Sequence, residues 1–184
     1  MTHVAEKTTP RGYRLSAPGG PVVAVHSDAL VTSPVPLAAV SAARLRPSVA
    51  VLLGRELAAG APPGAVERAI GAAFVAVEVS DPDGGPARFV LGERAVELPL
   101  GGPLTLWQTG TDAEVTQPES FGDLVTRVGA AAGEAGGLPP GAIVLVGPIR
   151  PGAGLPARPG TVQLWGPGFA TVIVAITSGE EAGA

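Results

Sequence analysis

Arg46 and Ser48 lie two positions apart in the segment RLRPSVAVLLGREL (44–57), where the odd-numbered positions from Leu45 to Leu53 are apolar. Alternation of period two is typical of a strand with one buried face, so the two polar side chains should share the opposite face. A guanidinium fixed on such a face could bind a carboxylate or stabilise an enolate. Ser48 has no obvious His or Asp partner in the sequence, which disfavours a role as a nucleophile.

Glu78 lies in VAVEVSD (75–81) and should project from the face opposite to the valines around it. Partial burial would favour a role as a general base. A pairing with Arg46 would instead make the carboxylate a weaker base with a structural role, and the sequence leaves both interpretations open. Asp81 follows in SDPDGG, a composition more typical of a turn.

His26 is the remaining candidate for imidazole chemistry near neutral pH, because the chain has two histidines and His3 lies close to the N-terminus. His26 ends the apolar run VVAVH (22–26), which predicts a strand. A single histidine on a strand is more often structural than catalytic.

Composition excludes several classes of function. The formal charge is -4 with no long run of either sign, which disfavours a nucleic-acid surface. The absence of Cys rules out disulfides, a thiol nucleophile and thiolate metal sites. The sequence contains no uninterrupted stretch of about 18 apolar residues, so it predicts no membrane span. The N-terminus lacks an apolar signal core, so we expect a cytoplasmic protein.

The pattern of short apolar runs between turns predicts an α+β fold that is mainly β. The 27 Gly and 20 Pro favour short elements. Two segments predict helices, 64–74 and about 119–135, the second with Ser120 as its cap and Gly136–Gly137 as its stop. We expect a single domain over 12–177, flanked by flexible ends at 1–11 and 178–184. The predicted strands are 22–26, 49–54, 75–80, 88–91, 104–108, 143–147, 162–165 and 171–176.

The order of several motifs resembles the fumarylacetoacetate hydrolase superfamily, and within it the 2-keto-4-pentenoate hydratase and 4-oxalocrotonate decarboxylase branch. The resemblance runs from Gly12 to Ile176. The motifs that carry it are GYRL (12–15), RLRPSVAVLLGREL (44–57), FVAVEVSDP (74–82), LPPGAIVLVGPI (138–149) and PGTVQLWGPGFATVIVAI (159–176). It implies a β-roll of mixed sheets with two helices and a site for keto or enol acids.

In this superfamily three acids hold Mg²⁺ or Mn²⁺, and the resemblance places those acids at Arg46, Ser48 and Glu78. Only Glu78 is a carboxylate here, so we expect no bound metal and no cofactor. The Gly-x-Lys motif of the family corresponds to Gly12-Tyr13-Arg14, which keeps the positive charge. Its hydroxyl-bearing turn corresponds to Val146-Gly147-Pro148, which loses the hydroxyls.

These observations favour a diverged, metal-independent enzyme acting on an enolisable or polyene small molecule as an isomerase, lyase or cyclase. The Ala, Gly, Pro and Arg content is typical of a high-GC bacterium, where specialised metabolism would fit. The alternatives are a non-catalytic homologue that binds a ligand or stabilises a partner subunit, and, less favoured, a Mg²⁺-dependent hydratase. We expect a homodimer and no membrane or nucleic-acid partner. The predicted catalytic residues are Glu78, Arg46 and His26, and the predicted substrate contacts are Arg14, Ser48, Trp107 and Gln108.

Overall fold

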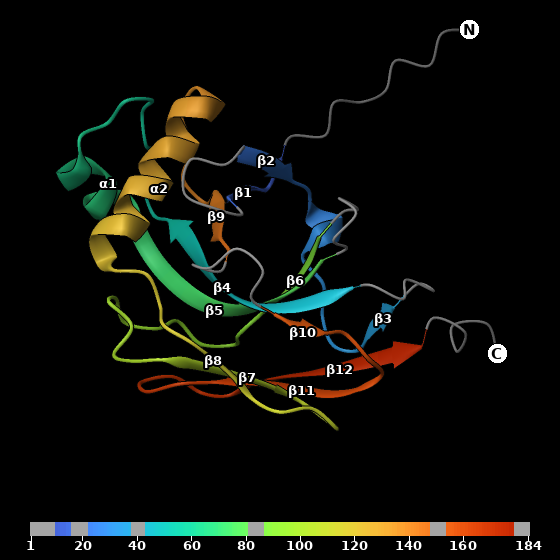
Figure 1. The fold of residues 1–184 in the computed structure, drawn as a ribbon. Helices are drawn as coiled ribbons and strands as arrows, with labels where there is room; N and C mark the ends of the chain where they lie inside the picture. Colours follow the sequence, from blue (N-terminus) through green and yellow to red (C-terminus); the bar gives the residue numbers. More distant parts are fainter. Residues whose placement is uncertain (1–9, 16–21, 38–42, 81–86, 148–153, 179–184) are drawn as a thin grey trace, which may run out of the picture.

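A computed structural model describes residues 10–15, 22–37, 43–80, 87–147 and 154–178 as two β-sheets with two helices (Figure 1). His3, Asp81 and Pro148, with most of the two expected flexible ends, lie outside the described residues. The predicted α+β fold of mixed sheets with two helices is confirmed.

The larger sheet has the strand order β2-β1-β9-β4-β5-β6, with β10 pairing β4 from the side. The pair β1–β9 is parallel, and the other pairs of this sheet are antiparallel. Its strands are β1 (Gly12–Leu15), β2 (Val22–Val25), β4 (Arg44–Leu53), β5 (Ile70–Ser80), β6 (Arg88–Leu91), β9 (Ile143–Val146) and β10 (Leu155–Pro156).

The smaller sheet has the order β3-β12-β11-β7-β8 and lies under one half of the larger sheet (Figure 1). Its strands are β3 (Val35–Leu37), β7 (Leu104–Gln108), β8 (Glu114–Thr116), β11 (Gly160–Trp165) and β12 (Val172–Ser178). Residues of both sheets form one apolar cluster, which includes Leu45, Val77, Leu106 and Val174.

A second apolar cluster covers the other half of the same face. Here α2 (Phe121–Ala135) packs Leu124 and Val128 against Val51 of β4 and Val144 of β9. One face of the larger sheet is therefore covered by the second sheet and by α2. The opposite face carries the even-numbered residues of β4 and β5, where a third, smaller apolar cluster includes Ala50, Phe89 and Leu145.

The second predicted helix is confirmed in its signals and its length. The Ser120 side chain accepts a hydrogen bond from the Asp123 amide (3.1 Å), as an N-cap does. Gly136 ends the helix in the left-handed conformation with φ 74°.

The first predicted helix, 64–74, was wrong in its second half. The helix α1 spans Pro63–Ala69, and β5 begins immediately at Ile70. Phe74 pairs with Ala50 of β4 in the sheet. The longer helix was predicted from the four-residue spacing of Val66, Ile70 and Phe74. Only Val66 is helical, because Ile70 and Phe74 pair with the long strand β4.

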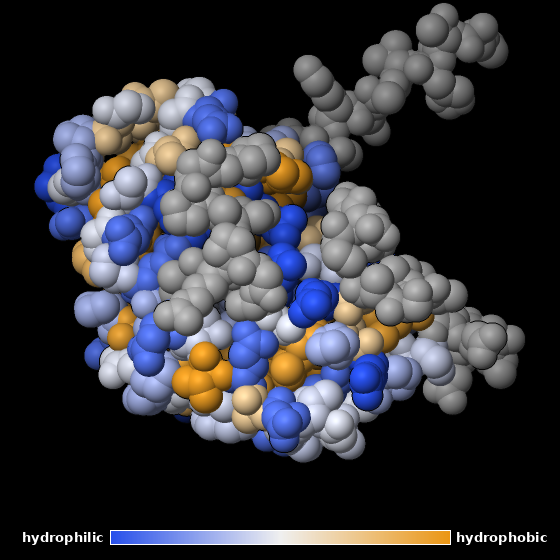
Figure 2. All heavy atoms as spheres, viewed as in Figure 1, coloured by the Kyte–Doolittle hydropathy of each residue, from blue (hydrophilic) through white to orange (hydrophobic). Residues whose placement is uncertain are grey.

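The outer face of the smaller sheet carries exposed apolar side chains. Val115 is 61% exposed, Ile173 60% and Trp165 36%. In Figure 2 apolar residues (orange) accordingly interrupt the hydrophilic surface over this sheet. Trp107 shares this outer face, since it pairs with Gln163, which in turn pairs with Ile173.

Gly71 marks the point where β4 and β5 approach too closely for a side chain. A Cβ atom at this position would lie 2.9 Å from both the Cα and the N of Gly54. We predict that Gly71→Ala lowers the free energy of unfolding by about 1–3 kcal/mol, because neither backbone can move aside without breaking the pairing.

Urea denaturation measures this loss, and Gly101→Ala is the matched control because a Cβ there meets nothing within 4 Å. Equal stability of the two variants would show that the strands separate without cost.

Candidate functional site

Three charged residues from three strands meet on the face of the larger sheet that is opposite to the second sheet and α2. The Glu78 side chain is 0% exposed, and its Oε1 accepts a hydrogen bond from Nη2 of Arg14 at 2.5 Å. Nη1 of Arg46 lies 3.9 Å from the same oxygen. Arg46 therefore lies beside Glu78, as the pairing interpretation of the sequence requires, and Arg14 is the nearer of the two cations.

The register of the sheet explains the meeting of Arg46 and Glu78, because they are direct cross-strand partners in β4 and β5. Arg14 needs a further explanation, since β9 and β4 lie between its strand and β5. Three strand spacings would place β1 about 14 Å from β5 in a flat sheet, beyond the reach of an arginine. The direct contact therefore requires the sheet to curl around this face.

The segment after β2 connects the two edges of the curled larger sheet. The Val31 amide donates to the carbonyl of Phe89 (3.0 Å), so a segment that leaves one edge strand reaches the opposite edge strand, β6. A hollow of about 1010 Å³ lies between them. Its polar lining residues are Arg14, His26, Asp28, Thr32 and Arg88, and its apolar ones include Val25, Leu30 and Phe89.

Arg14 connects this hollow to Glu78. Its side chain is 17% exposed, and its guanidinium carbon lies 6.0 Å from the centre of the Phe89 ring. That distance permits a cation–π attraction, which helps to hold the guanidinium between the ring and the carboxylate. Phe89 pairs with Glu78 across β5 and β6 and was missed by the sequence reasoning, although RFVL (88–91) was predicted as a strand.

Several buried polar atoms on this face have no hydrogen-bond partner. They are Nε of Arg14, Oγ of Ser48, Oε2 of Glu78 and Oγ of Ser80. Cross-strand pairing places Ser48, Ser80 and Glu78 on one face. Buried polar groups are normally satisfied, so such a concentration indicates hydrogen bonding to water or to a ligand.

The backbone of Gly154 packs closely against the side chain of Arg46. A Cβ atom at this glycine would lie 2.8 Å from Cγ of Arg46 and 2.6 Å from the carbonyl oxygen of Leu45. Its amide donates to both carboxylate oxygens of Glu114 (2.9 and 3.0 Å), and its carbonyl accepts from Arg44 (2.7 Å). In the sequence this residue is one glycine among many, with no signal that it touches the site.

The other predicted site residues are dispersed. His26 is exposed at the edge of the hollow, and Ser48 is buried on the face that carries Glu78. Gln108 is buried on the inner face of the smaller sheet, where its side chain donates to the carbonyl of Arg158. The structure therefore does not bring Gln108 or the outward-facing Trp107 to Glu78.

The donor set around Glu78 does not fit a divalent cation. Mg²⁺ and Mn²⁺ require several oxygen ligands, whereas two guanidinium groups lie against this carboxylate. Within the described ranges no three His, Cys, Asp or Glu side chains form a group that could hold a metal ion.

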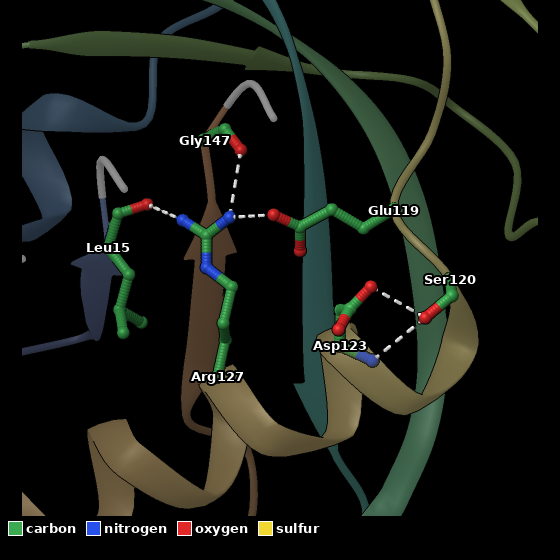
Figure 3. Close-up of polar contacts among 6 residues, drawn as sticks. All are labelled: Leu15, Glu119, Ser120, Asp123, Arg127 and Gly147. Atoms are coloured by element: carbon green, nitrogen blue, oxygen red, sulfur yellow. Dashed lines mark hydrogen bonds and ion pairs between the residues drawn. The ribbon is translucent and has the colours of Figure 1, made fainter. Parts of the chain in front are cut away.

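A second buried ion pair joins α2 to the ends of β1 and β9 (Figure 3). Arg127 is 4% exposed and pairs with Glu119. Its Nη2 donates to the carbonyl of Leu15 (2.5 Å) and its Nη1 to that of Gly147 (3.4 Å). The Leu15 carbonyl also accepts from the Gly147 amide (2.9 Å), so Arg127 adds a second donor there and links the ends of two parallel strands.

Glu119 also lines a small, mainly apolar cavity of about 30 Å³ beside α2. Burial raises the pKa of Glu119 above its ordinary value of 4.5, and Asp123 adds to the rise, while the Arg127 guanidinium acts in the opposite direction. Neither residue was singled out from the sequence, because an acid before a helix cap and an arginine inside a helix are common surface features.

No protein-family profile matches this chain, and no curated protein matches it. Solved structures do. The 4-oxalocrotonate decarboxylase from Pseudomonas putida G7, complexed with magnesium and adipate, has a TM-score of 0.70 at 17% identity over 92% of this chain and 78% of that chain.

Two further structures agree with it. The 5-carboxymethyl-2-hydroxymuconate delta-isomerase from Mycobacterium smegmatis has a TM-score of 0.65 at 18% identity, over 89% of this chain and 71% of that one. A Yersinia pestis CO92 protein assigned to the fumarylacetoacetate hydrolase family has a TM-score of 0.66 at 18% identity, over 91% of this chain and 93% of its own.

The chain has the fumarylacetoacetate hydrolase fold. The resemblance inferred from the motif order is thus confirmed as a resemblance of fold. At these identities the comparison establishes architecture, and the chemistry must be argued from the side chains. In the described part of the chain, no helix has the length and apolar character needed to cross a bilayer.

We predict that Arg14→Met and Glu78→Met each lower the free energy of unfolding by about 3–5 kcal/mol, because each leaves a buried charge without its nearest partner. The double variant Arg14→Met/Glu78→Met should cost less than the sum of the two. Denaturant unfolding of all four proteins gives the coupling energy. Additive losses would mean that the 2.5 Å contact contributes nothing.

We predict that acidification stabilises the wild-type protein relative to Glu119→Gln. A carboxyl with a raised pKa in the folded state contributes stability that is full below its unfolded pKa and is lost as the pH rises through the folded value. Melting temperatures between neutral pH and 4.5 measure the difference.

The exposed variant Glu67→Gln is the control and should show no such trend. A relative loss of stability on acidification would mean that Arg127, not burial, dominates the titration of Glu119.

Proposed function

We propose that this protein is a metal-independent enzyme that converts an enolisable or polyene small molecule by isomerisation, bond cleavage or cyclisation. The observation that carries this proposal is the contact of both Arg14 and Arg46 with one oxygen of the buried Glu78. Fixed guanidinium groups stabilise a developing enolate in the way a metal ion would, without a coordination sphere.

The two oxygens of Glu78 then have different roles. Oε1 is held by the arginines, whereas Oε2 has no partner and remains able to accept a proton from a bound substrate. Removal of that proton forms an enolate, and Arg14 is placed to stabilise its charge. His26, at the edge of the hollow, is the candidate that gives a proton to another carbon of the substrate, after which Glu78 releases the proton it took and His26 regains one from water.

The solved structures with the same fold include an isomerase and a decarboxylase, which agrees with an enzyme that handles enolic intermediates. A cyclase would use the same Glu78 and Arg14 on a longer, apolar substrate. The wall of the hollow includes Val25, Leu30 and Phe89, which suits such a substrate.

The alternative is a non-catalytic homologue that binds a ligand. It is favoured by the complete burial of Glu78, because a carboxylate with 0% exposure and two cationic neighbours could serve the fold alone. Catalysis of proton exchange separates the two functions.

We predict that the protein accelerates exchange of the C3 protons of 2-oxopentanoate in D₂O, and that EDTA leaves the rate unchanged. Proton NMR follows the loss of the C3 signal. Glu78→Gln should reduce the rate at least about 100-fold, the lower range for loss of a general base.

Val115→Ala, an exposed position on the other sheet, is the control that should retain the rate. If EDTA abolishes the exchange, the result would favour the alternative of a Mg²⁺-dependent hydratase. No exchange above the rate in buffer would favour the non-catalytic homologue.

A further inference from the structure

The Arg14–Glu78 pair offers one unused donor and one unused acceptor at the same place. Nε of Arg14 is buried without a partner, and so is Oε2 of Glu78. Ser48, on the same sheet face as Glu78, adds a hydroxyl that is also without a partner. Leaving such groups unpaired costs free energy, and a ligand that satisfies both at once gains that energy on binding.

Charge decides what kind of head group can do this. Arg14 is the direct partner of Oε1 at 2.5 Å, and Arg46 lies farther from that oxygen at 3.9 Å. The unpaired Nε of Arg14 and Oε2 of Glu78 therefore each require a complementary atom in the ligand, an acceptor and a donor. A carboxylate ligand would satisfy Arg14 and be repelled by Oε2 of Glu78. An ammonium or amidinium would satisfy Glu78 and be repelled by Arg14.

We propose that this site recognises a neutral head group that donates one hydrogen bond and accepts another, such as an amide, a lactam or an enolised ketone, on an apolar body. The acceptor of the head group faces Arg14, and its donor faces Oε2 of Glu78. This inference rests on the proposed function only in sharing its site, and it names the substrate class.

The surroundings fit the apolar body of such a ligand. Phe89 lies against Arg14 and lines the hollow together with Val25 and Leu30. Arg14 is the residue common to the hollow and to the ion pair. The proposal therefore places the head group where the hollow meets the Arg14 side chain, with Glu78 directly behind that side chain.

Three probes of nearly identical shape separate the possibilities. Benzamide offers a donor and an acceptor, benzoate only acceptors, and benzamidine in its cationic form only donors. We expect benzamide to bind wild-type protein at least about tenfold more tightly than either charged probe, the factor that one charge-assisted hydrogen bond supplies. NMR titration of the Arg14 Nε–H signal, assigned with Arg14→Gln, measures all three.

Glu78→Gln should reverse the order between two of the probes. The new amide can donate to a carboxylate, and the repulsion is gone, so benzoate should bind this variant better than benzamide does. Glu119→Gln removes a different buried carboxylate and should keep the wild-type order. If Glu78→Gln does not fold, Arg14→Gln provides the second test, because benzamide should lose its advantage when the Nε donor is removed.

Tightest binding of benzoate to the wild type would overturn the proposal in favour of an anion site, and tightest binding of benzamidine in favour of a cation site. No binding of any probe at millimolar concentration would overturn it as well. Benzamide binding without proton exchange of the keto acid would keep this inference while contradicting the proposed catalysis.

Discussion

The contact between Arg14 and Glu78 is the constraint on which the site depends. It joins β1 to β5 across two intervening strands, so it exists only because the larger sheet curls. The curl in turn needs both apolar clusters on the opposite face, where the second sheet and α2 hold the sheet in shape. A buried carboxylate with two cationic neighbours is thus maintained by packing that lies on the other side of the sheet.

The same feature separates this site from a metal centre of the same fold. Arg46 stands where the resemblance places an acid, directly across from Glu78. A metal ion beside Glu78 would compete for this carboxylate with the guanidinium groups of Arg14 and Arg46, which are fixed to the sheet. The fold accommodates two guanidinium groups beside Glu78, and an architecture shared with a decarboxylase complexed with magnesium does not by itself assign the chemistry of this chain.

The periodicity and capping signals of the sequence predicted the features that depend on neighbouring residues along the chain. The alternation in 44–53 and 75–80 gave the two central strands and the shared face of Arg46 and Glu78, and the cap at Ser120 gave α2. The approach of Arg14 to Glu78 was not predicted, because it depends on the curl of the sheet; the resemblance indicated only that Arg14 keeps a positive charge. Phe89 and Gly154 carry no periodic signal, and Ile70–Phe74 entered a strand because its partner strand was longer than its own pattern showed.

The position of β9 has a consequence for when the Arg14–Glu78 contact can form during synthesis. β9, at Ile143–Val146, lies between β1 and β4, so β1 has no place in the sheet until residue 146 has left the ribosome. Residues 14, 46 and 78 are all made early, yet Arg14 cannot reach Glu78 before most of the chain exists. A nascent chain that stops short of β9 would hold Glu78 without its nearest cation, so a chain truncated before residue 143 would lack the Arg14–Glu78 contact.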